Sequence, residues 1–244
     1  MPDHQLLSFP TDNALADAAA DRWLSALATR PDAGEPFCAA LSGGRIAKKF
    51  FETLTHHTGS RRSLFASVDF FWADERCVPP TDTESNFGLA RTHLLAPLGI
   101  LPDRIHRLRG EIAPERAAAE GEAEICRIAP MNAAGQPVLD LVLLGMGEDG
   151  HVASLFPGAP DAVVGGGAVY QPVTASKPPP RRITMNFPTI AAARQVWVLA
   201  SGAGKTEALR ESLSPGGQTP LARVLQSRQN TILFTDIPDV GANG

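Results

Sequence analysis

The sequence has few cysteines, and those it has are far apart. Cys38, Cys77 and Cys126 include no Cys-x-x-Cys pair, and no histidine lies close to them in the chain. This spacing indicates neither a zinc site nor a disulfide framework. An odd number of scattered thiols is typical of a protein kept in a reducing compartment. We therefore expect a cytoplasmic location and no metal.

Long apolar runs and an excess of basic charge are also missing. No apolar run approaches the roughly 18 residues of a membrane span. The start, Met1-Pro-Asp-His-Gln, lacks the basic and apolar parts of a signal peptide. The formal net charge is −4, which favours neither nucleic acid nor a membrane surface as a partner. Any anionic ligand must therefore be met by a local cluster of basic residues.

What the 244 residues do contain is an alternation of apolar runs with helical patterns. The expected strands are 37–41, 63–72, 105–108, 138–144, 169–173, 183–187, 195–201 and 231–235. The expected helices are 13–29, 46–54, 86–95, 114–128 and 220–225, and residues 162–167 are expected to form a surface loop. This order predicts one α/β domain over residues 1–244, with a single doubly wound, mostly parallel sheet flanked by helices.

The most informative stretch is 138–158, where an apolar run stops at a polar turn rich in glycine. The run has the aliphatic content of a strand buried on both faces. Glycines at 145, 147 and 150 then allow the backbone to come close to a ligand, and the turn carries Glu148, Asp149 and His151. A lone loop histidine is more often a surface residue. Here it follows a central strand together with two carboxylates, where open α/β sheets bind ligands.

A second strand leads directly into Ser42, Gly43, Gly44 and Arg45, after which a helical pattern begins. A strand, a Gly-Gly turn and a helix start together present free backbone N–H groups and the positive end of a helix dipole to an anion. An ordinary tight turn is the alternative, because Gly-Gly without a longer fingerprint is a weak signal.

Two further charged segments stand beside expected strands. Residues 74–76 are Asp-Glu-Arg, with Asn86 further on; the alternative here is a solvated, internally salt-bridged turn. The second segment is Lys177-Pro-Pro-Pro-Arg-Arg182, in which the prolines stiffen the backbone and hold the basic side chains apart. An exposed linker is the alternative for this segment.

Residues 202–206, Gly-Ala-Gly-Lys-Thr, invite comparison with a P-loop. The phosphate cradle also needs a glycine five residues before the Gly-Lys-Thr ending, and that position is Leu199, inside an expected strand. A helix that opens with Lys205 on its first turn is the simpler interpretation.

The run 145–158, Gly-Met-Gly-Glu-Asp-Gly-His-Val-Ala-Ser-Leu-Phe-Pro-Gly, resembles the signature loop of the 6-phosphogluconolactonases. The Ser-Gly-Gly turn, the Asp-Glu-Arg segment and the Lys-Pro-Pro segment resemble further parts of that family. They occur in the family's order over nearly the whole chain. One departure is Arg45, where the family usually has Ser or Thr.

The resemblance implies the modified Rossmann fold shared by lactonases and sugar-phosphate isomerases. It also implies hydrolysis of 6-phospho-D-glucono-1,5-lactone in the oxidative pentose phosphate pathway. His151 is then the candidate general base and acid, with Asp149 or Glu148 orienting it or binding sugar hydroxyls. The substrate-binding candidates are Ser42, Gly43, Gly44, Arg45, Asp74, Glu75, Arg76, Asn86, Gly147, Lys177 and Arg182.

Among these candidates, Arg45, Arg76, Lys177 and Arg182 are expected to meet the phosphate or the oxyanion, and Lys177 and Arg182 are expected to be held towards one anion. No cofactor is expected, and the expected partner is the sugar-phosphate lactone alone, bound by a monomer or a weak homo-oligomer.

Three alternatives stay open at this point. A sugar-phosphate deaminase would share the Asp-Gly-His turn, but Leu155-Phe156-Pro157-Gly158 stands where deaminases typically carry Asn-Glu-Pro-Gly. A non-catalytic sugar-phosphate sensor would keep the pocket without turnover. A P-loop nucleotide-binding protein is disfavoured by Leu199.

Overall fold

The computed structural model describes residues 4–30, 35–159 and 166–240. Within these ranges a six-stranded parallel sheet has the strand order β1-β9-β8-β5-β2-β3. Its strands are β1 (His4–Ser8), β2 (Phe37–Leu41), β3 (Val68–Trp72), β5 (Leu141–Gly145), β8 (Gln195–Ala200) and β9 (Thr231–Thr235). The expected doubly wound, mostly parallel sheet is confirmed. Most of the expected loop 162–167 lies outside the described residues.

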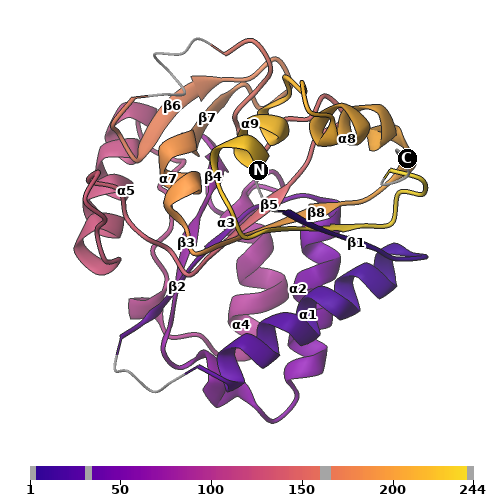
Figure 1. Cartoon of the computed structure of the whole chain (residues 1–244). Helices are drawn as coiled ribbons and strands as arrows, with labels where there is room; N and C mark the ends of the chain where they lie inside the picture. Colours follow the sequence, from indigo (N-terminus) through magenta and orange to yellow (C-terminus); the bar gives the residue numbers. More distant parts are fainter. Residues whose placement is uncertain (1–3, 31–34, 160–165, 241–244) are drawn as a thin grey trace.

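Helices cover both faces of this sheet (Figure 1). The helices α1 (Asp12–Ala28), α2 (Arg45–Thr58) and α4 (Ala96–Leu98) lie on one face. The other face carries α7 (Phe187–Ala192), α8 (Thr206–Leu213) and α9 (Pro220–Ser227). No helix of the described chain is long and apolar enough to cross a membrane.

Aromatic packing fixes α1 and α2 against the sheet. The Trp23 ring of α1 is fully buried and stacks on Phe50 of α2 with a centroid distance of 5.8 Å. It also contacts Phe70 of β3 at 6.5 Å. Each such pair adds about 0.5–1.5 kcal/mol beyond area burial. The first turn of α2 is thereby held at the carboxyl end of β2.

A second, antiparallel sheet was not expected from the sequence. It joins β4 (Asp74–Arg76), β7 (Arg181–Met185) and β6 (Tyr170–Thr174) in the order β4-β7-β6. Helix α5 (Pro114–Ile128) packs against β6 and β7. Residues 74–76 had been read as a loop, because three residues show no periodicity and their partner strand lies about a hundred residues away in the sequence. The pairing sets Arg76 opposite Arg182.

The elements differ from expectation at a few other places. Residues 105–108 form no strand, since Ile105 makes only a single bridge to Phe70. The edge strand β1 was not expected. The expected helix 86–95 is divided into α3 (Asn86–Ala90) and a π-helical turn at Arg91–Leu95.

The strand order places a crevice between β2 and β5. The next strand of this sheet after β2 is β3, on one side, whereas the next after β5, reached by way of β6 and β7 of the second sheet, is β8 on the other side. Loops that leave neighbouring strands in opposite directions open a crevice at the carboxyl ends, and this topological switch point is where such sheets bind ligands.

One buried carboxylate joins β4 to α3. Glu75 accepts hydrogen bonds from the backbone N–H groups of Asn86 (2.7 Å), Phe87 (2.8 Å) and Arg76 (2.8 Å), and from the Ser85 hydroxyl (3.1 Å). Burial raises the pKa of Glu75 to about 7, although the N–H donors act to lower it. The charged loop predicted from the sequence is therefore a rigid corner rather than a solvated turn.

Because burial raises the pKa of Glu75 from 4.5 to about 7, its ionisation disfavours the folded state, and this contribution to the free energy of unfolding should fall as the pH rises between these two values. We expect Glu75→Gln, which cannot ionise, to lack that fall. Urea unfolding of the variant and the wild type at pH 5 and pH 8 measures the difference. The control is Glu207→Gln, which removes an exposed i,i+3 pair with Arg210 worth less than about 1 kcal/mol. The same pH dependence in Glu75→Gln and in the wild type would contradict the prediction.

Candidate active site

A pocket opens at the switch point, lined by residues that follow the carboxyl ends of β2, β3, β5 and β8 and by Arg182 of β7. The described lining residues are Ser42, Gly43, Gly44, Arg45, Ile46, Asp74, Arg76, Asn86, Gly145, Met146, His151, Ala153, Arg182, Ser201 and Lys205. Most of the sequence candidates are therefore brought together here. No group of three or more metal-binding side chains occurs among the described residues.

His151 is held through one ring nitrogen and free at the other. Its Nδ1 lies 2.5 Å from Asp149 Oδ1, and its backbone N–H also donates to that oxygen. Partial burial acts to raise the pKa of Asp149, but the hydrogen bonds and charge of His151 outweigh it and hold the pKa below its ordinary value. Within the described ranges His151 Nε2 has no hydrogen-bond partner. A neutral ring that donates from Nδ1 leaves its Nε2 lone pair available as a base.

Two glycines are needed so that side chains can approach the backbone. A Cβ at Gly147 would lie 2.1 Å from the His151 ring, and a Cβ at Gly43 would lie 1.9 Å from Asn86 Oδ1. The Asn86 amide in turn donates to the Asp74 carbonyl (2.9 Å) and carboxylate (3.2 Å). The second Asp74 oxygen accepts from Ser154 Oγ at 2.8 Å. This network fixes the floor of the pocket.

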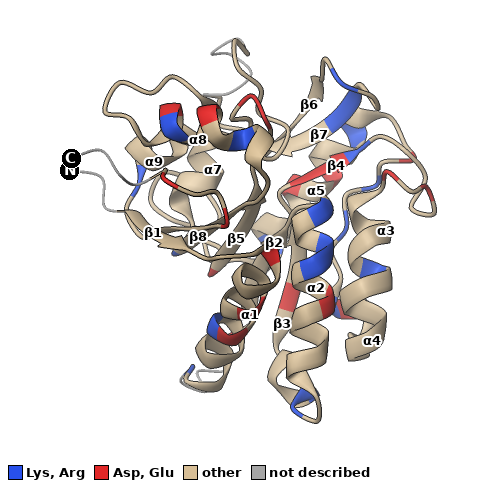
Figure 2. Ribbon diagram, turned by 90° about the vertical axis from the view of Figure 1, so that its right-hand side faces the viewer, with Lys and Arg blue, Asp and Glu red and all other residues tan. Residues whose placement is uncertain are grey.

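One end of the pocket combines backbone donors with positive charge. Helix α2 starts after Gly44 with no side-chain cap, so the first N–H groups of the helix lack intrahelical partners. The Ser42 hydroxyl is buried and has no partner among the described residues. Figure 2 shows basic positions gathered in the first turns of α2. These are the features of an anion-binding helix terminus.

Arg45 and Lys205 add two cations at this end. The Arg45 guanidinium lies close to Gly202. Burial lowers the pKa of Lys205, and the Arg45 charge lowers it further, while Glu148 and Asp236 act in the opposite direction. Neither cation has a carboxylate within ion-pair distance in the part of the chain that the structure describes. We call Ser42, the α2 N-terminus, Arg45 and Lys205 the anion end of the pocket.

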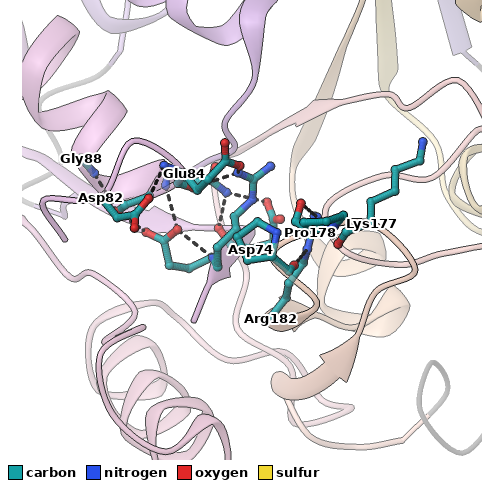
Figure 3. A network of polar contacts seen from close by, with 12 residues as sticks. Asp74, Asp82, Glu84, Gly88, Lys177, Pro178 and Arg182 are labelled. Carbon is teal, nitrogen blue, oxygen red and sulfur yellow. Dashed lines mark hydrogen bonds and ion pairs between the residues drawn. The ribbon is translucent and has the colours of Figure 1, made fainter. Parts of the chain in front are cut away.

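Arg182 and Arg76 supply positive charge elsewhere on the pocket wall. Arg182 is buried, and it donates to the carbonyls of Pro179 (2.9 Å), Lys177 (3.3 Å) and Pro178 (3.4 Å) (Figure 3). Burial lowers the Arg182 pKa, with a further contribution from Arg76. Arg76 donates to the Glu84 carbonyl and carboxylate. The described chain offers Arg182 no carboxylate within ion-pair distance, so an anion is its natural complement.

Five candidates lie outside the lining; besides Asp149, which holds His151, they are Lys177, Glu75, Glu148 and Gly147. Lys177 is exposed and its side chain extends away from Arg182 (Figure 3); only its carbonyl takes part, so the pair is not held towards one anion. Glu75 is the corner residue described above. Glu148 lies beside Gly204 and acts on the pKa of Lys205, so Asp149 is the carboxylate that contacts the His151 ring. Gly147 acts by making room for that ring.

The sequence interpretation assigned no ligand role to Lys205 or Ser201. Lys205 ends a 3₁₀ turn at Ala203–Lys205, directly before α8, and the helix interpretation was therefore correct to within one residue. The sequence did contain a hint of a ligand role for Lys205, because its Gly-x-x-Lys turn follows a strand that ends at the same sheet edge as β2 and β5. Leu199 is buried within β8. A P-loop would need a glycine in a turn at this position, so the sequence argument against a P-loop is confirmed.

Fold and pocket together define an α/β enzyme with a site for a small anionic substrate at the sheet's switch point. The family model described as glucosamine-6-phosphate isomerases/6-phosphogluconolactonase matches residues 10–233. The chain belongs to this family, and the resemblance inferred from the sequence is confirmed.

Individual relatives agree with this assignment. A 6-phosphogluconolactonase of Treponema pallidum is 40% identical over 186 residues, which covers 75% of each chain. One of Streptomyces coelicolor is 33% identical over 240 residues and covers 95% of this chain and 92% of its own. The solved structure of 6-phosphogluconolactonase from Trypanosoma brucei has a TM-score of 0.86 at 29% identity and covers 96% of this chain and 97% of its own.

Proposed function

We propose that this protein hydrolyses 6-phospho-D-glucono-1,5-lactone to 6-phospho-D-gluconate, as a carboxylic ester hydrolase of the pentose phosphate pathway. The observation that carries the proposal is the pairing of His151 with Asp149 in a pocket that also contains an anion end. Lactonase relatives that match most of the chain support the same activity.

His151 acts first as a general base and then as a general acid. Asp149 holds the proton on Nδ1, so Nε2 takes a proton from water as that water attacks the lactone carbonyl. The tetrahedral intermediate carries an oxyanion, which needs fixed donors or positive charge close by. Arg182 and Arg76 are suited to this because they line the same pocket. Nε2 then returns its proton to the departing ring oxygen, and the ring opens.

The phosphate binds at the anion end of the pocket. Ser42, the free N–H groups of α2, Arg45 and Lys205 together offer hydroxyl, amide and charged donors, which is the mixture that phosphate sites use. This assignment moves the phosphate away from Lys177, where the sequence had suggested it. With the phosphate at the anion end, Arg182 is assigned to the lactone group, which is the reacting end of the substrate.

A glucosamine-6-phosphate deaminase activity is the second candidate and is disfavoured. The position of its expected glutamate after the Asp-Gly-His turn is occupied here by Phe156, which has no acid–base group. Ammonia release from glucosamine 6-phosphate, assayed beside lactone loss, separates the two activities. We further infer that the protein acts in the cytoplasm, because its three cysteines are unpaired, and that it works as a monomer or a weak homo-oligomer.

His151→Asn should lower kcat/KM by about 10²- to 10⁴-fold, the usual loss when a general acid–base group is removed. The fold should persist, since His151 lies on a loop at the pocket rather than in the core. The measurement is lactone loss above spontaneous hydrolysis, with circular dichroism as the check on folding. Near wild-type turnover would exclude His151 from the mechanism.

Arg45→Ala and Lys205→Ala should each weaken binding of the phosphorylated lactone by about 1.5–3 kcal/mol, the range for hydrogen bonds to charged groups. Both variants should lose most of their preference for this substrate over plain glucono-lactone. The readout is kcat/KM for the two lactones. Lys48→Ala, on the exposed side of the same helix, is the matched control.

Lys177→Ala distinguishes the two assignments of the phosphate. Because the Lys177 side chain is exposed and does not line the pocket, this variant should resemble Lys48→Ala. A loss of phosphate preference in Lys177→Ala, with Arg45→Ala and Lys205→Ala unaffected, would reverse the assignment.

Hydrolysis should survive exhaustive treatment with EDTA, because the proposed steps use an imidazole and fixed charges. Rates measured before and after dialysis against the chelator test this. A loss that zinc or magnesium restores would indicate a metal-activated water instead.

A further inference from the structure

Phe156 lies between the base of the proposed reaction and the buried arginine. Its ring centroid is 4.6 Å from that of His151, with the planes tilted by 40°. The Arg182 guanidinium carbon lies 5.5 Å from the same Phe156 centroid. One half-buried aromatic side chain therefore contacts both groups, although it does not itself line the substrate pocket.

The other contacts of His151 leave the plane of its ring incompletely fixed. The Asp149 carboxylate holds Nδ1, but a single side-chain hydrogen bond fixes one atom and allows the ring to pivot about it. Gly147 makes room for the ring on one side without holding it. Terminal torsions of histidine are broad and impose little preference of their own. A flat surface against the imidazole supplies the missing restraint.

Arg182 is restrained in a complementary way. Three carbonyls of the 177–179 segment accept its hydrogen bonds on Nε and Nη2. These bonds fix the guanidinium relative to its own loop, which belongs to the antiparallel sheet, whereas His151 belongs to the loop after β5. The two segments are joined near the backbone by Ser154, whose N–H donates to Thr184 Oγ1 of β7 at 3.2 Å. Phe156 adds a link between the side chains themselves, because its ring contacts both the imidazole and the guanidinium.

We propose that Phe156 is a positioning residue that orients the His151 imidazole and keeps it in register with Arg182. This inference rests on the proposed function, and it extends that function to a side chain with no acid–base chemistry. Misplacing a catalytic group by about 1 Å costs up to about 100-fold in rate. The defect should appear in turnover, because the anion end of the pocket does not involve Phe156.

The experiment compares Phe156→Leu, Phe156→Tyr and Phe87→Leu in steady-state hydrolysis of the phosphorylated and plain lactones. Leu keeps an apolar side chain but removes the flat face. Tyr keeps the ring, and its hydroxyl has space, because Phe156 borders a neighbouring open cavity together with Pro172 and Val173. Phe87 is the matched control, since its ring is also half-buried and lies 5.4 Å from the guanidinium carbon of Arg107 without contacting His151.

Phe156→Leu should lower kcat by about 10- to 100-fold while KM changes by less than about threefold. Both lactones should be affected in the same proportion, Tyr should restore most of the activity, and Phe87→Leu should remain near wild type. Thermal unfolding confirms that every variant is folded at the assay temperature.

The outcomes are separable from failure of the proposed function. If the wild-type protein does not accelerate lactone hydrolysis, the proposed function itself is wrong. If the wild type is active, then unchanged kcat in Phe156→Leu overturns the role of Phe156. So does a loss that Phe156→Tyr shares, that Phe87→Leu reproduces, or that appears only in KM for the phosphorylated lactone.

Discussion

The parallel pairing of β2 with β5 is the constraint on which the site depends. Ala39 and Ala40 lie opposite Leu141 and Val142, and Asp140 accepts a hydrogen bond from the Cys38 N–H at 2.9 Å. This register brings the Ser-Gly-Gly turn and the Gly-Glu-Asp-Gly-His turn to the same edge. After β2 the chain enters α2 on one face of the sheet, whereas after β5 it continues to β6 and β7 on the other face, so the two turns separate beyond the sheet edge (Figure 1). The space between them is the pocket, and the anion end and His151 are placed by the same pairing.

Among the residues that the structure describes, Arg45, Arg182 and Lys205 have no carboxylate within ion-pair distance, which disfavours the folded protein when no ligand is bound. Arg182 and Lys205 are buried enough that desolvation lowers the pKa of each. Their neighbours Arg76 and Arg45 add repulsion rather than relief. Natural cores rarely bury unpaired cations, so the arrangement is best understood as complementarity to an anion.

The sequence predicted those features that are local in the chain. The strand before His151, the Gly-Gly turn before α2 and the limits of α5 are each set by neighbouring residues, and all were found in place. The second sheet was missed because β4 pairs with a strand far away along the chain. Lys177 was proposed for the phosphate from the family resemblance and from the proline-stiffened turn that it flanks. In the structure this turn directs three carbonyls at Arg182 and leaves the Lys177 side chain exposed. The place of Lys205 in the pocket was not predicted, because only the strand order shows that β8 lies beside β5.

An arginine at position 45, where the family usually has Ser or Thr, depends on a glycine at the distant position 202. Its guanidinium lies where a Cβ at residue 202 would come within 2.9 Å of Nη2, and Gly202 has a φ of 103°, a conformation that side chains rarely adopt. Glycine at 202 is therefore needed twice, for the turn that leads to Lys205 and for the approach of Arg45. A Ser or Thr at position 45 would offer phosphate one hydroxyl, whereas Arg45 offers several donors and a charge beside Lys205. The two cations repel each other in the free protein, and an anion bound between them removes that repulsion. In the proposed phosphate site, Arg45 would therefore make binding depend more strongly on the charge of the ligand.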